Sequence, residues 1–178
     1  MKKFELTAEF VTNVFGKKLF RIKALVAFGN VKKGELGGFI EKEDNLSHSG
    51  NAWVSGDAQV YGNAQVYDNA RVYGDAWVFG DAQVSGDARV SGDARVYGNA
   101  DYAVVTGFGR YFRATTFFRC KDKIIRVQCG CFYGDLAQFR EIVKKTHGDS
   151  KYAKEYLAIA DLMELHFSDE EENQEAAK

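Results

Sequence analysis

The chain repeats one six-residue phrase without a break from Asn45 to Asn99. From Gly50 onward the repeat runs GNAWVS GDAQVY GNAQVY DNARVY GDAWVF GDAQVS GDARVS GDARVY GNA. Every sixth residue is Asp or Asn, followed by Ala and, two residues further on, by Val. A fixed period of this kind constrains the architecture, because each repeat must adopt the same local structure and meet its neighbours in the same way.

Each hexad is typical of a short strand followed by a corner. Val is β-branched and favours extended backbone, and the alternation of a strand places Val and the Ala two residues before it on one face. Gly followed by Asp or Asn favours a turn, because Gly tolerates positive φ and Asx side chains bond to nearby backbone. Stacked coils would then pair with the coils above and below, which leaves open edges only at the two ends. The regular Val and Ala positions argue against a disordered low-complexity segment.

The repeat is similar to the hexapeptide repeat of left-handed parallel β-helices: Val, then Tyr, Ser or Phe, then Gly, then Asp or Asn, then Ala. That resemblance implies a triangular prism with three hexads, or 18 residues, per coil, and so about three coils here. We therefore expect a mainly β fold with four segments. They are an N-terminal β cap (1–44), the repeat region (45–104), a small α+β module in ββαα order (105–167) and an acidic, disordered tail (168–178).

The 18-residue spacing arranges outward side chains in columns. The first face carries Gln59, Trp77 and Arg95 beside Tyr61, Phe79 and Tyr97, the second carries Trp53, Arg71 and Arg89 beside Ser55, Tyr73 and Ser91, and the third is plainer. We call Tyr61, Trp77, Phe79, Arg95 and Tyr97 the aromatic strip. Contiguous exposed apolar surface marks interaction sites, so we predict an interface here, most simply with a second or third copy of the chain. The alternatives are an internal ladder of stacked rings, or a floor covered by the chain's own terminal segments.

Composition limits the class of partner. The 178 residues carry a net charge of −1, which argues against a dedicated nucleic-acid binder. The first ten residues have no apolar core and no run is long enough to span a bilayer, so we expect neither a secretory leader nor a membrane partner. Three cysteines without such a leader indicate reduced thiols in the cytoplasm.

The segment before the repeats is predicted to form short strands, with Gly16-Lys17 as a turn after Val14-Phe15. Phe20 and Ile22 alternate with charged residues, as in a half-buried strand. His48 occupies a Val position of the first hexad, where we expect a half-sheltered cap residue rather than a ligand or a base.

After the repeats, TTFFRC and IIRVQCGCF are predicted to be two strands joined at residues 121–123. Two amphipathic helices should follow, capped by Asp135 and Ser150, the first ending at Gly148. Cys129 and Cys131, two apart on one strand, could join Cys120 and His147 in a zinc site. The C-x-C spacing suits such a site poorly, so we favour buried structural thiols with no metal or other cofactor.

Cations crowd the segment from residue 110 to residue 126. Arg110, Arg113 and Arg126, with the hydroxyls of Thr115 and Thr116, could hold a phosphate or a carboxylate. The alternative is a basic hairpin whose side chains are solvated. The direction of the side chains distinguishes the two alternatives, because a ligand site needs its cations to converge, whereas a solvated hairpin would point them into water.

Two resemblances bear on function. Many hexapeptide-repeat proteins are trimeric acyltransferases with a histidine base, but no histidine lies between His48 and His147. A closer likeness spans FGKKLFRIKAL, GELGGFIEKEDNLSHSGNAWVSGDAQV, TTFFRC, CGCFYGDLAQF and THGDSKYAKEYL, which resemble a family of repeat proteins encoded by phages, prophages and bacterial mobile elements. That resemblance implies no reaction and carries over no catalytic residue.

We therefore expect a non-enzymatic binding or scaffold protein in the host-cell cytoplasm, forming a dimer or trimer or binding a host or phage protein. One alternative is a counter-defence factor that captures a phosphorylated small ligand or a host protein. The other is an acyltransferase of the hexapeptide type.

Overall fold

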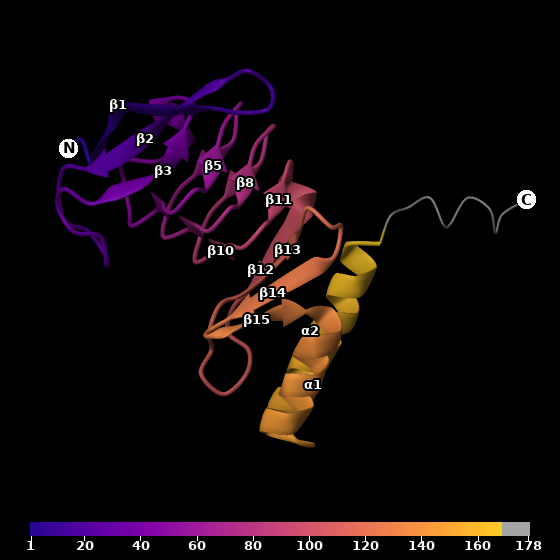
Figure 1. Cartoon of the computed structure of the whole chain (residues 1–178). Helices are drawn as coiled ribbons and strands as arrows, with labels where there is room; N and C mark the ends of the chain where they lie inside the picture. Colours follow the sequence, from indigo (N-terminus) through magenta and orange to yellow (C-terminus); the bar gives the residue numbers. More distant parts are fainter. Residues whose placement is uncertain (169–178) are drawn as a thin grey trace, which may run out of the picture.

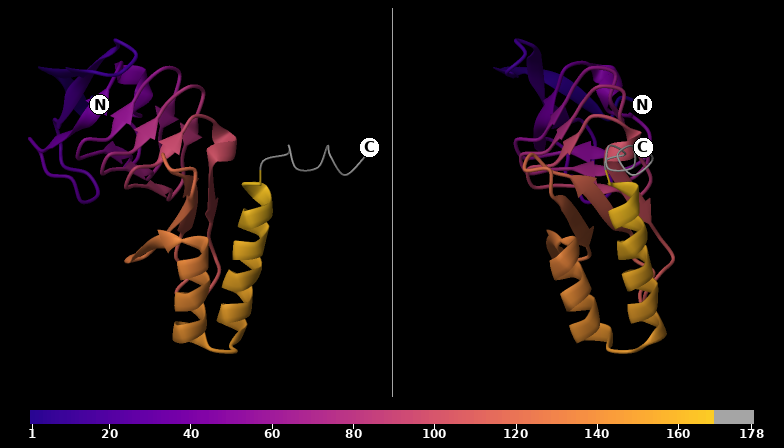
Figure 2. Two further views of the ribbon diagram at one scale, coloured as in Figure 1. Left: turned by 45° about the vertical axis from the view of Figure 1, so that its right-hand side comes forward. Right: turned by 90° about the vertical axis from the view of Figure 1, so that its right-hand side faces the viewer.

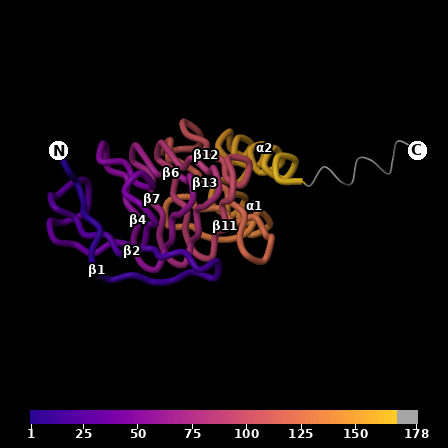
Figure 3. Tube along the Cα trace, turned by 90° about the horizontal axis from the view of Figure 1, so that it is seen from above, coloured from indigo at the N-terminus to yellow at the C-terminus, as the bar shows by residue number. Residues whose placement is uncertain are grey.

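The computed structural model describes residues 1–168 and consists of three parts in a row (Figure 1). An N-terminal hairpin region comes first, a stack of short strands follows, and a module with two helices comes last. Seen from above, the N-terminus and helix α2 (Lys151–His166) lie at opposite ends of the stack (Figure 3). Of the predicted tail over residues 168–178, all but Ser168 lies outside the described residues.

The repeat region forms a β-solenoid of about three turns, as predicted. Residues 18 apart pair in parallel, for example Gln59 with Trp77 and Arg71 with Arg89. The three faces of the coil are the sheets β5-β8-β11, β4-β7-β10 and β6-β9. The left-handed sense of the coil stays a prediction. The strands are β4 (Trp53–Val54), β5 (Gln59–Val60), β6 (Gln65–Val66), β7 (Arg71–Val72), β8 (Trp77–Val78), β9 (Gln83–Val84), β10 (Arg89–Val90) and β11 (Arg95–Val96).

The core of the solenoid is the column of Ala and Val side chains. Every Ala and Val of the hexads from Ala52 to Val96 is fully buried, which confirms the predicted inside and outside of the coil. Burying one such Val contributes about 1.5–3 kcal/mol. The Gly corners of successive coils are also closely packed. A Cβ on Gly74, for example, would lie 3.0 Å from the backbone nitrogen of Gly92. Asp68 stands where the other hexads have Gly and adopts a φ of 57°, which Asp tolerates better than most residues.

The N-terminal strands extend the first face of the solenoid rather than covering its end alone. β1 (Phe4–Thr12) and β2 (Lys18–Ala24) form an antiparallel hairpin, and β3 (Leu36–Ile40) pairs antiparallel with β2 and parallel with β5. The sheet therefore runs β1-β2-β3-β5-β8-β11. The 3-10 turn η1 (Glu43–Asn45) leads from β3 into the first coil.

One detail of the hairpin differs from the prediction, and another agrees with it. Val14 and Phe15 lie in the turn between β1 and β2, not in a strand. Phe20 is half-buried and Ile22 is fully buried, as expected for a half-buried strand. Phe20 pairs with Ile40, and Ile22 pairs with Leu6, so both lie on the side of β2 that faces the core of the solenoid.

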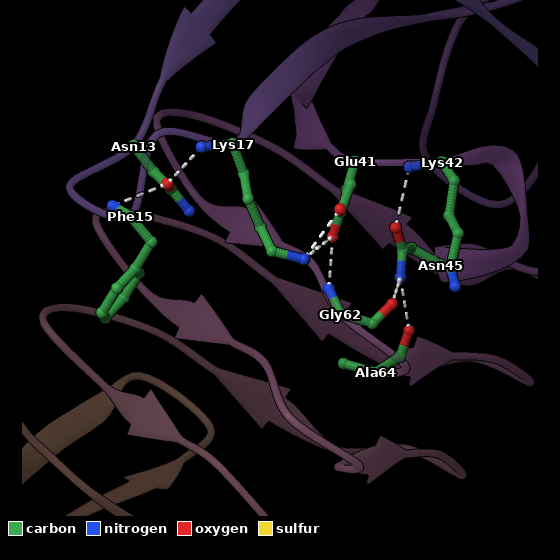
Figure 4. Close-up of polar contacts among 8 residues, drawn as sticks. All are labelled: Asn13, Phe15, Lys17, Glu41, Lys42, Asn45, Gly62 and Ala64. Carbon is green, nitrogen blue, oxygen red and sulfur yellow. Dashed lines mark hydrogen bonds and ion pairs between the residues drawn. The ribbon is translucent and has the colours of Figure 1, made fainter.

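Side chains complete the hydrogen bonding where the first coil has no coil before it. The Asn45 amide donates to the carbonyls of Gly62 at 3.2 Å and Ala64 at 2.8 Å, and its oxygen accepts from the Lys42 N–H (Figure 4). Glu41 accepts from the Gly62 N–H at 2.6 Å and from Lys17 Nζ at 2.8 Å. Burial alone would raise the pKa of Glu41, but the hydrogen bonds from Lys17 and Gly62 hold it below its usual value.

The C-terminal module has two strands more than the predicted ββαα order. It lies beyond the last coil, and its two helices lie side by side (Figure 2). Its antiparallel sheet runs β12 (Tyr102–Val105), β13 (Thr115–Arg119), β14 (Ile125–Cys129) and β15 (Phe132–Asp135). Helices α1 (Leu136–His147) and α2 (Lys151–His166) follow, capped by Asp135 and Ser150 as predicted. The sequence prediction missed β12 and β15, because a short edge strand that follows a decaying repeat or a tight turn carries little pattern of its own. The second 3-10 turn, η2 (Asn99–Asp101), connects the last coil to β12.

Strand β13 joins the module to the solenoid through its alternating side chains. Phe117 packs in the core that the sheet shares with α1 and α2, whereas Phe118 packs in the core of the solenoid. Both side chains are fully buried. The strand therefore lies across the open end of the last coil and has no solvent-facing side in its centre.

Neither described helix is both long enough and apolar enough to cross a membrane.

Candidate functional site: a cationic groove

The end of the aromatic strip at Tyr61 is covered by the chain itself. Tyr61 is only 4% exposed and packs with Leu19 of β2 and Phe39 of β3. This corrects the assignment of Tyr61 to an intermolecular interface. The cover is the N-terminal hairpin region, because the two C-terminal helices pack on their own sheet instead.

The rest of the strip forms a ladder of stacked side chains that is exposed to solvent at its other end, at Tyr97. The Phe79 ring stacks on Tyr61 at 5.1 Å and meets Tyr97 edge to face at 5.3 Å. The Arg95 guanidinium lies 4.1 Å from the centre of the Trp77 ring and donates to the carbonyl of Asp75. Trp77 and Phe79 are half-buried, and Tyr97 is 63% exposed. An interface at Trp77, Phe79, Arg95 and Tyr97 stays a prediction.

The predicted anion-binding residues do not form one site. Thr115 and Thr116 are buried, and their hydroxyls are used internally: Thr115 donates to Cys129 Sγ at 3.2 Å, and Thr116 accepts from the Arg89 N–H at 3.0 Å. Arg126 forms an ion pair with Asp122 at 2.7 Å. None of these three residues lines the cavity that Arg110 and Arg113 share.

Arg113 instead lies with two arginines of the second solenoid face. We call the hollow that they share the cationic groove. It has a volume of about 660 Å³ and adjoins a smaller hollow of about 310 Å³ beside Tyr73. The lining residues of the groove are Gly29, Asn30, Asn51, Asn69, Arg71, Asp87, Arg89, Arg113, Ala114, Gly130 and Cys131.

Each wall of the groove comes from a different part of the chain. The floor is the sheet β4-β7-β10, which holds Arg71 and Arg89 in register on neighbouring strands. The N-terminal region contributes Gly29 and Asn30, and the C-terminal module contributes Arg113 and the turn between β14 and β15. At that turn Gly130 leaves room for Arg113, because a Cβ there would lie 2.8 Å from Arg113 Nη1.

Positive charge dominates the groove. Within residues 1–168, the guanidinium groups of Arg71 and Arg89 have no hydrogen bond or ion pair, and that of Arg113 only lies 5.0 Å from the Tyr111 ring. Asp87 is the carboxylate in the lining, and it accepts from Asn69 Nδ2 at 3.2 Å. The lining therefore holds three guanidinium groups and one carboxylate, and this excess of positive charge favours an anionic ligand. The forked N–H groups of arginine also match phosphate and carboxylate oxygens.

Arg71 and Arg89 belong to one outward column of the second face, and the sequence alone assigns that column no function. The 18-residue spacing alone was enough to place these two side chains next to each other. Their proximity to Arg113 depends on the fold of the loop between β12 and β13, whose residues follow no periodic pattern.

The cysteines are distributed differently from the prediction. Cys120 is buried, and burial raises the pKa of its thiol to about 12. Cys129 is half-buried, whereas Cys131 is exposed in the turn between β14 and β15, so the two do not share one strand face. Within the described part of the chain, no three His, Cys, Asp or Glu side chains gather in a way that could hold a metal ion.

His48 is a half-sheltered residue of the N-terminal end, as predicted. Its ring stacks on Phe4 at 4.3 Å. Nδ1 accepts from the Lys3 N–H at 3.1 Å, so Nε2 can carry the proton that is shared with Glu43 at 2.6 Å. This hydrogen bond with His48 is the main reason why the pKa of Glu43 lies below its usual value. Both ring nitrogens are engaged, which leaves neither free to act as a base.

A comparison with protein families supports the solenoid. The family model described as the YdcK beta solenoid repeat matches residues 64–80 and 82–98, two consecutive stretches of the hexads. The chain is therefore similar to β-solenoid repeat proteins over the middle and last coils. No curated protein matches it.

Proposed function

We propose that this protein is a non-enzymatic binding protein that holds a phosphorylated small ligand in the cationic groove. The observation that carries the proposal is the convergence of Arg71, Arg89 and Arg113, which come from two parts of the chain. Phosphate groups are bound tightly by arginine because two N–H groups of one guanidinium can contact two phosphate oxygens.

The shape of the groove supports a ligand of limited size. Its volume of about 660 Å³ lies within the usual range for small-molecule sites. The groove is also pre-formed, since parallel strands fix the spacing of Arg71 and Arg89 before any ligand arrives. A rigid site of this kind loses little conformational entropy on binding.

The chemistry of the lining supports binding rather than catalysis. Arginine does not release its proton in proteins, and asparagine does not titrate. The remaining ionisable side chains are Asp87, which is hydrogen-bonded to Asn69, and Cys131. A capture protein needs no more than this, whereas an acyltransferase needs a general base.

The origin and role of the protein belong to the same proposal. A phage or mobile element could use such a protein in the host cytoplasm to withdraw a phosphorylated ligand from solution, or to bind a host protein on the same rigid face. The resemblance to phage- and prophage-encoded repeat proteins supports this role.

Isothermal titration calorimetry with inorganic pyrophosphate tests the groove. The double change Arg71→Gln and Arg89→Gln should weaken binding by about tenfold for each arginine, because each removes a charge-assisted hydrogen bond. The matched control is Lys145→Gln with Lys154→Gln, which removes the same charge from exposed positions on α1 and α2. Equal affinity of the wild type and the arginine double variant would contradict the proposal.

A second function, self-association, is favoured by the open end of the aromatic strip. Tyr97 is 63% exposed beside half-buried Phe79 and Trp77. If a second copy covers this end, Tyr97→Ser should cost about 2 kcal/mol of association, or about thirtyfold in Kd. Sedimentation should then show a smaller species with an unchanged circular dichroism spectrum. An unchanged mass would argue against the interface, and a lower melting temperature with that mass would assign Tyr97 to internal packing.

A further inference from the structure

A second cavity lies in the C-terminal module, between the helices and the loop that connects β12 to β13. Its volume is about 190 Å³, and we call it the C-terminal pocket. Most of its wall is apolar and comes from Phe132, Phe139, Ile142, Val143 and Tyr156. An apolar cavity of about 150 Å³ can hold a molecule the size of benzene, so this pocket has room for one aromatic ring.

Aromatic side chains form a rigid wall on one side of the pocket. The Phe139 ring meets Tyr156 edge to face at 5.7 Å and Phe132 at 5.7 Å. Phe139 and Tyr156 are almost fully buried, and burial raises the pKa of Tyr156 to about 12, so its hydroxyl stays protonated. A planar ring is the ligand group that fits such a wall, because aromatic rings prefer edge-to-face and offset contacts.

Two arginines line the pocket beside this apolar wall. The guanidinium groups of Arg110 and Arg113 lie 5.6 Å and 5.0 Å from the centre of the Tyr111 ring. Neither forms an ion pair within residues 1–168. Glu155, the carboxylate that contacts this loop, is occupied by the Gly109 N–H at 2.9 Å and by Lys151 at 3.5 Å.

The loop is held in an unusual conformation. Phe112 has a φ of 52°, although its side chain is 70% exposed and gains little from burial. Gly109 has a φ of 71°, and a Cβ at this position would collide with the Tyr156 hydroxyl. Backbone strain of this kind is concentrated at ligand clamps and active sites. The strain therefore points to a use for the loop beyond connecting two strands.

We infer that the C-terminal pocket binds a small aromatic carboxylate, with the ring against Phe132, Phe139 and Val143 and the carboxylate toward Arg110 and Arg113. The apolar wall selects for a ring, and the two arginines in the lining select for an anion. A carboxylate suits the pocket better than a phosphate, because a doubly charged group costs more to bring next to an apolar wall. This inference does not depend on the function proposed for the cationic groove.

Ligand-observed NMR on the full chain tests the pocket, with phenylacetate as the probe and benzyl alcohol as its uncharged counterpart. Phenylacetate should bind about tenfold more tightly, since only its carboxylate can pair with the arginines. Arg110→Gln should reduce this preference, because Arg113 remains, and should leave the affinity for benzyl alcohol unchanged. Lys145→Gln, which removes a charge elsewhere on α1, should change neither affinity. Equal binding of both probes, or an unaltered preference in Arg110→Gln, would overturn the inference.

A filling variant supplies a test that does not depend on charge. Ile142 lines the pocket but is 38% exposed on α1, so Ile142→Trp can occupy the cavity without rebuilding the core. It should abolish binding of both probes while thermal unfolding stays cooperative. Binding that survives in a folded Ile142→Trp would place the probes elsewhere and overturn the inference.

The pocket and the groove can fail separately. Arg110 lines the pocket and not the groove, Arg89 lines the groove and not the pocket, and Arg113 lines both. Arg89→Gln should therefore leave phenylacetate binding unchanged, and Arg110→Gln should leave pyrophosphate binding unchanged. Loss of phenylacetate binding in Arg89→Gln would contradict the assignment of this ligand to the pocket.

Discussion

The two ends of the solenoid face the same problem and solve it with opposite chemistry. In each coil the N–H of the residue before Val donates to the carbonyl of the Ala 17 residues later, for example Trp53 to Ala70 and Gln65 to Ala82. The Ala carbonyls of the first coil therefore lack a donor, and the corresponding N–H groups of the last coil lack that acceptor. A stack of identical coils thus has two chemically different ends.

At the N-terminal end, the missing partners are hydrogen-bond donors. Lys3 Nζ donates to the Ala52 carbonyl at 2.9 Å, and Asn45 Nδ2 donates to that of Ala64 at 2.8 Å. On the first face the backbone of β3 takes this role, since the Phe39 N–H donates to Ala58.

At the C-terminal end, the missing partners are acceptors. The Gln83 N–H donates to Asn99 Oδ1 at 2.8 Å, and the Arg89 N–H donates to Thr116 Oγ1 at 3.0 Å. The comparison teaches that a cap must match the direction of the ladder as well as cover the core. Asn serves at both ends, because its amide offers a donor at Asn45 and an acceptor at Asn99.

The largest effect is expected at the N-terminal end from Asn45→Asp. The carboxylate cannot donate to the carbonyls of Gly62 and Ala64, and it lies next to them while fully buried. We expect a loss of about 3 kcal/mol or more in the free energy of unfolding, measured by urea titration. Asn45→Ala, which orphans the same carbonyls without adding a charge, should lose less. Equal stability of Asn45→Asp and wild type would contradict the conclusion that this end requires hydrogen-bond donors.

A smaller effect is expected at the C-terminal end from Thr116→Val. The change keeps the shape of a side chain that is 1% exposed but removes the acceptor for the Arg89 N–H. The free energy of unfolding should fall by about 1–3 kcal/mol, the usual cost of a buried polar group left without a partner. Thr116→Ser retains the hydroxyl and serves as the control. If Thr116→Val proved less damaging than Thr116→Ser, packing rather than the acceptor would dominate this end.

The smallest effect concerns pH at the N-terminal end. Burial lowers the pKa of Lys3 from 10.5 to about 8, so between these values the unfolded chain binds more protons than the folded chain. Stability contributed by this group should rise as pH increases from 8 to 10.5, and below pH 8 the full cost of burying the charge remains. Relative to Lys3→Met, the wild type should gain about 1 kcal/mol in urea titrations between pH 8 and pH 10. Lys2→Met, at an exposed ion pair with Glu43, should follow the wild type.

The periodic part of the fold could be predicted from the sequence, because its structure is decided by neighbours at a fixed spacing. Val72 and Val78 had to be buried once the hexads were stacked, and both are. The helix caps Asp135 and Ser150 were equally predictable, since a cap depends only on residues a few positions away.

The remaining features depend on contacts that are distant in sequence. Nothing near Tyr61 in the sequence indicated that Leu19 would cover it, because the contact depends on β3 pairing with both β2 and β5. Likewise, Thr115 and Thr116 are typical of both an anion site and a buried strand. Only the sheet that forms on either side of them, with the solenoid beneath it, decides between the two.

The 18-residue coil also determines how the cationic groove could change in size. The walls at its two ends belong to the regions before and after the repeats. The length of its floor is set by the number of coils between them. Adding one coil would separate the walls by one strand spacing, about 4.8 Å, and would add one outward side chain to the row of Arg71 and Arg89. An insertion of six or twelve residues would keep Val inside but move the later columns to another face, and an insertion that is not a multiple of six would turn Val away from the core. The groove can therefore lengthen only in steps of one coil, and each added coil supplies one new position for a contact with the ligand.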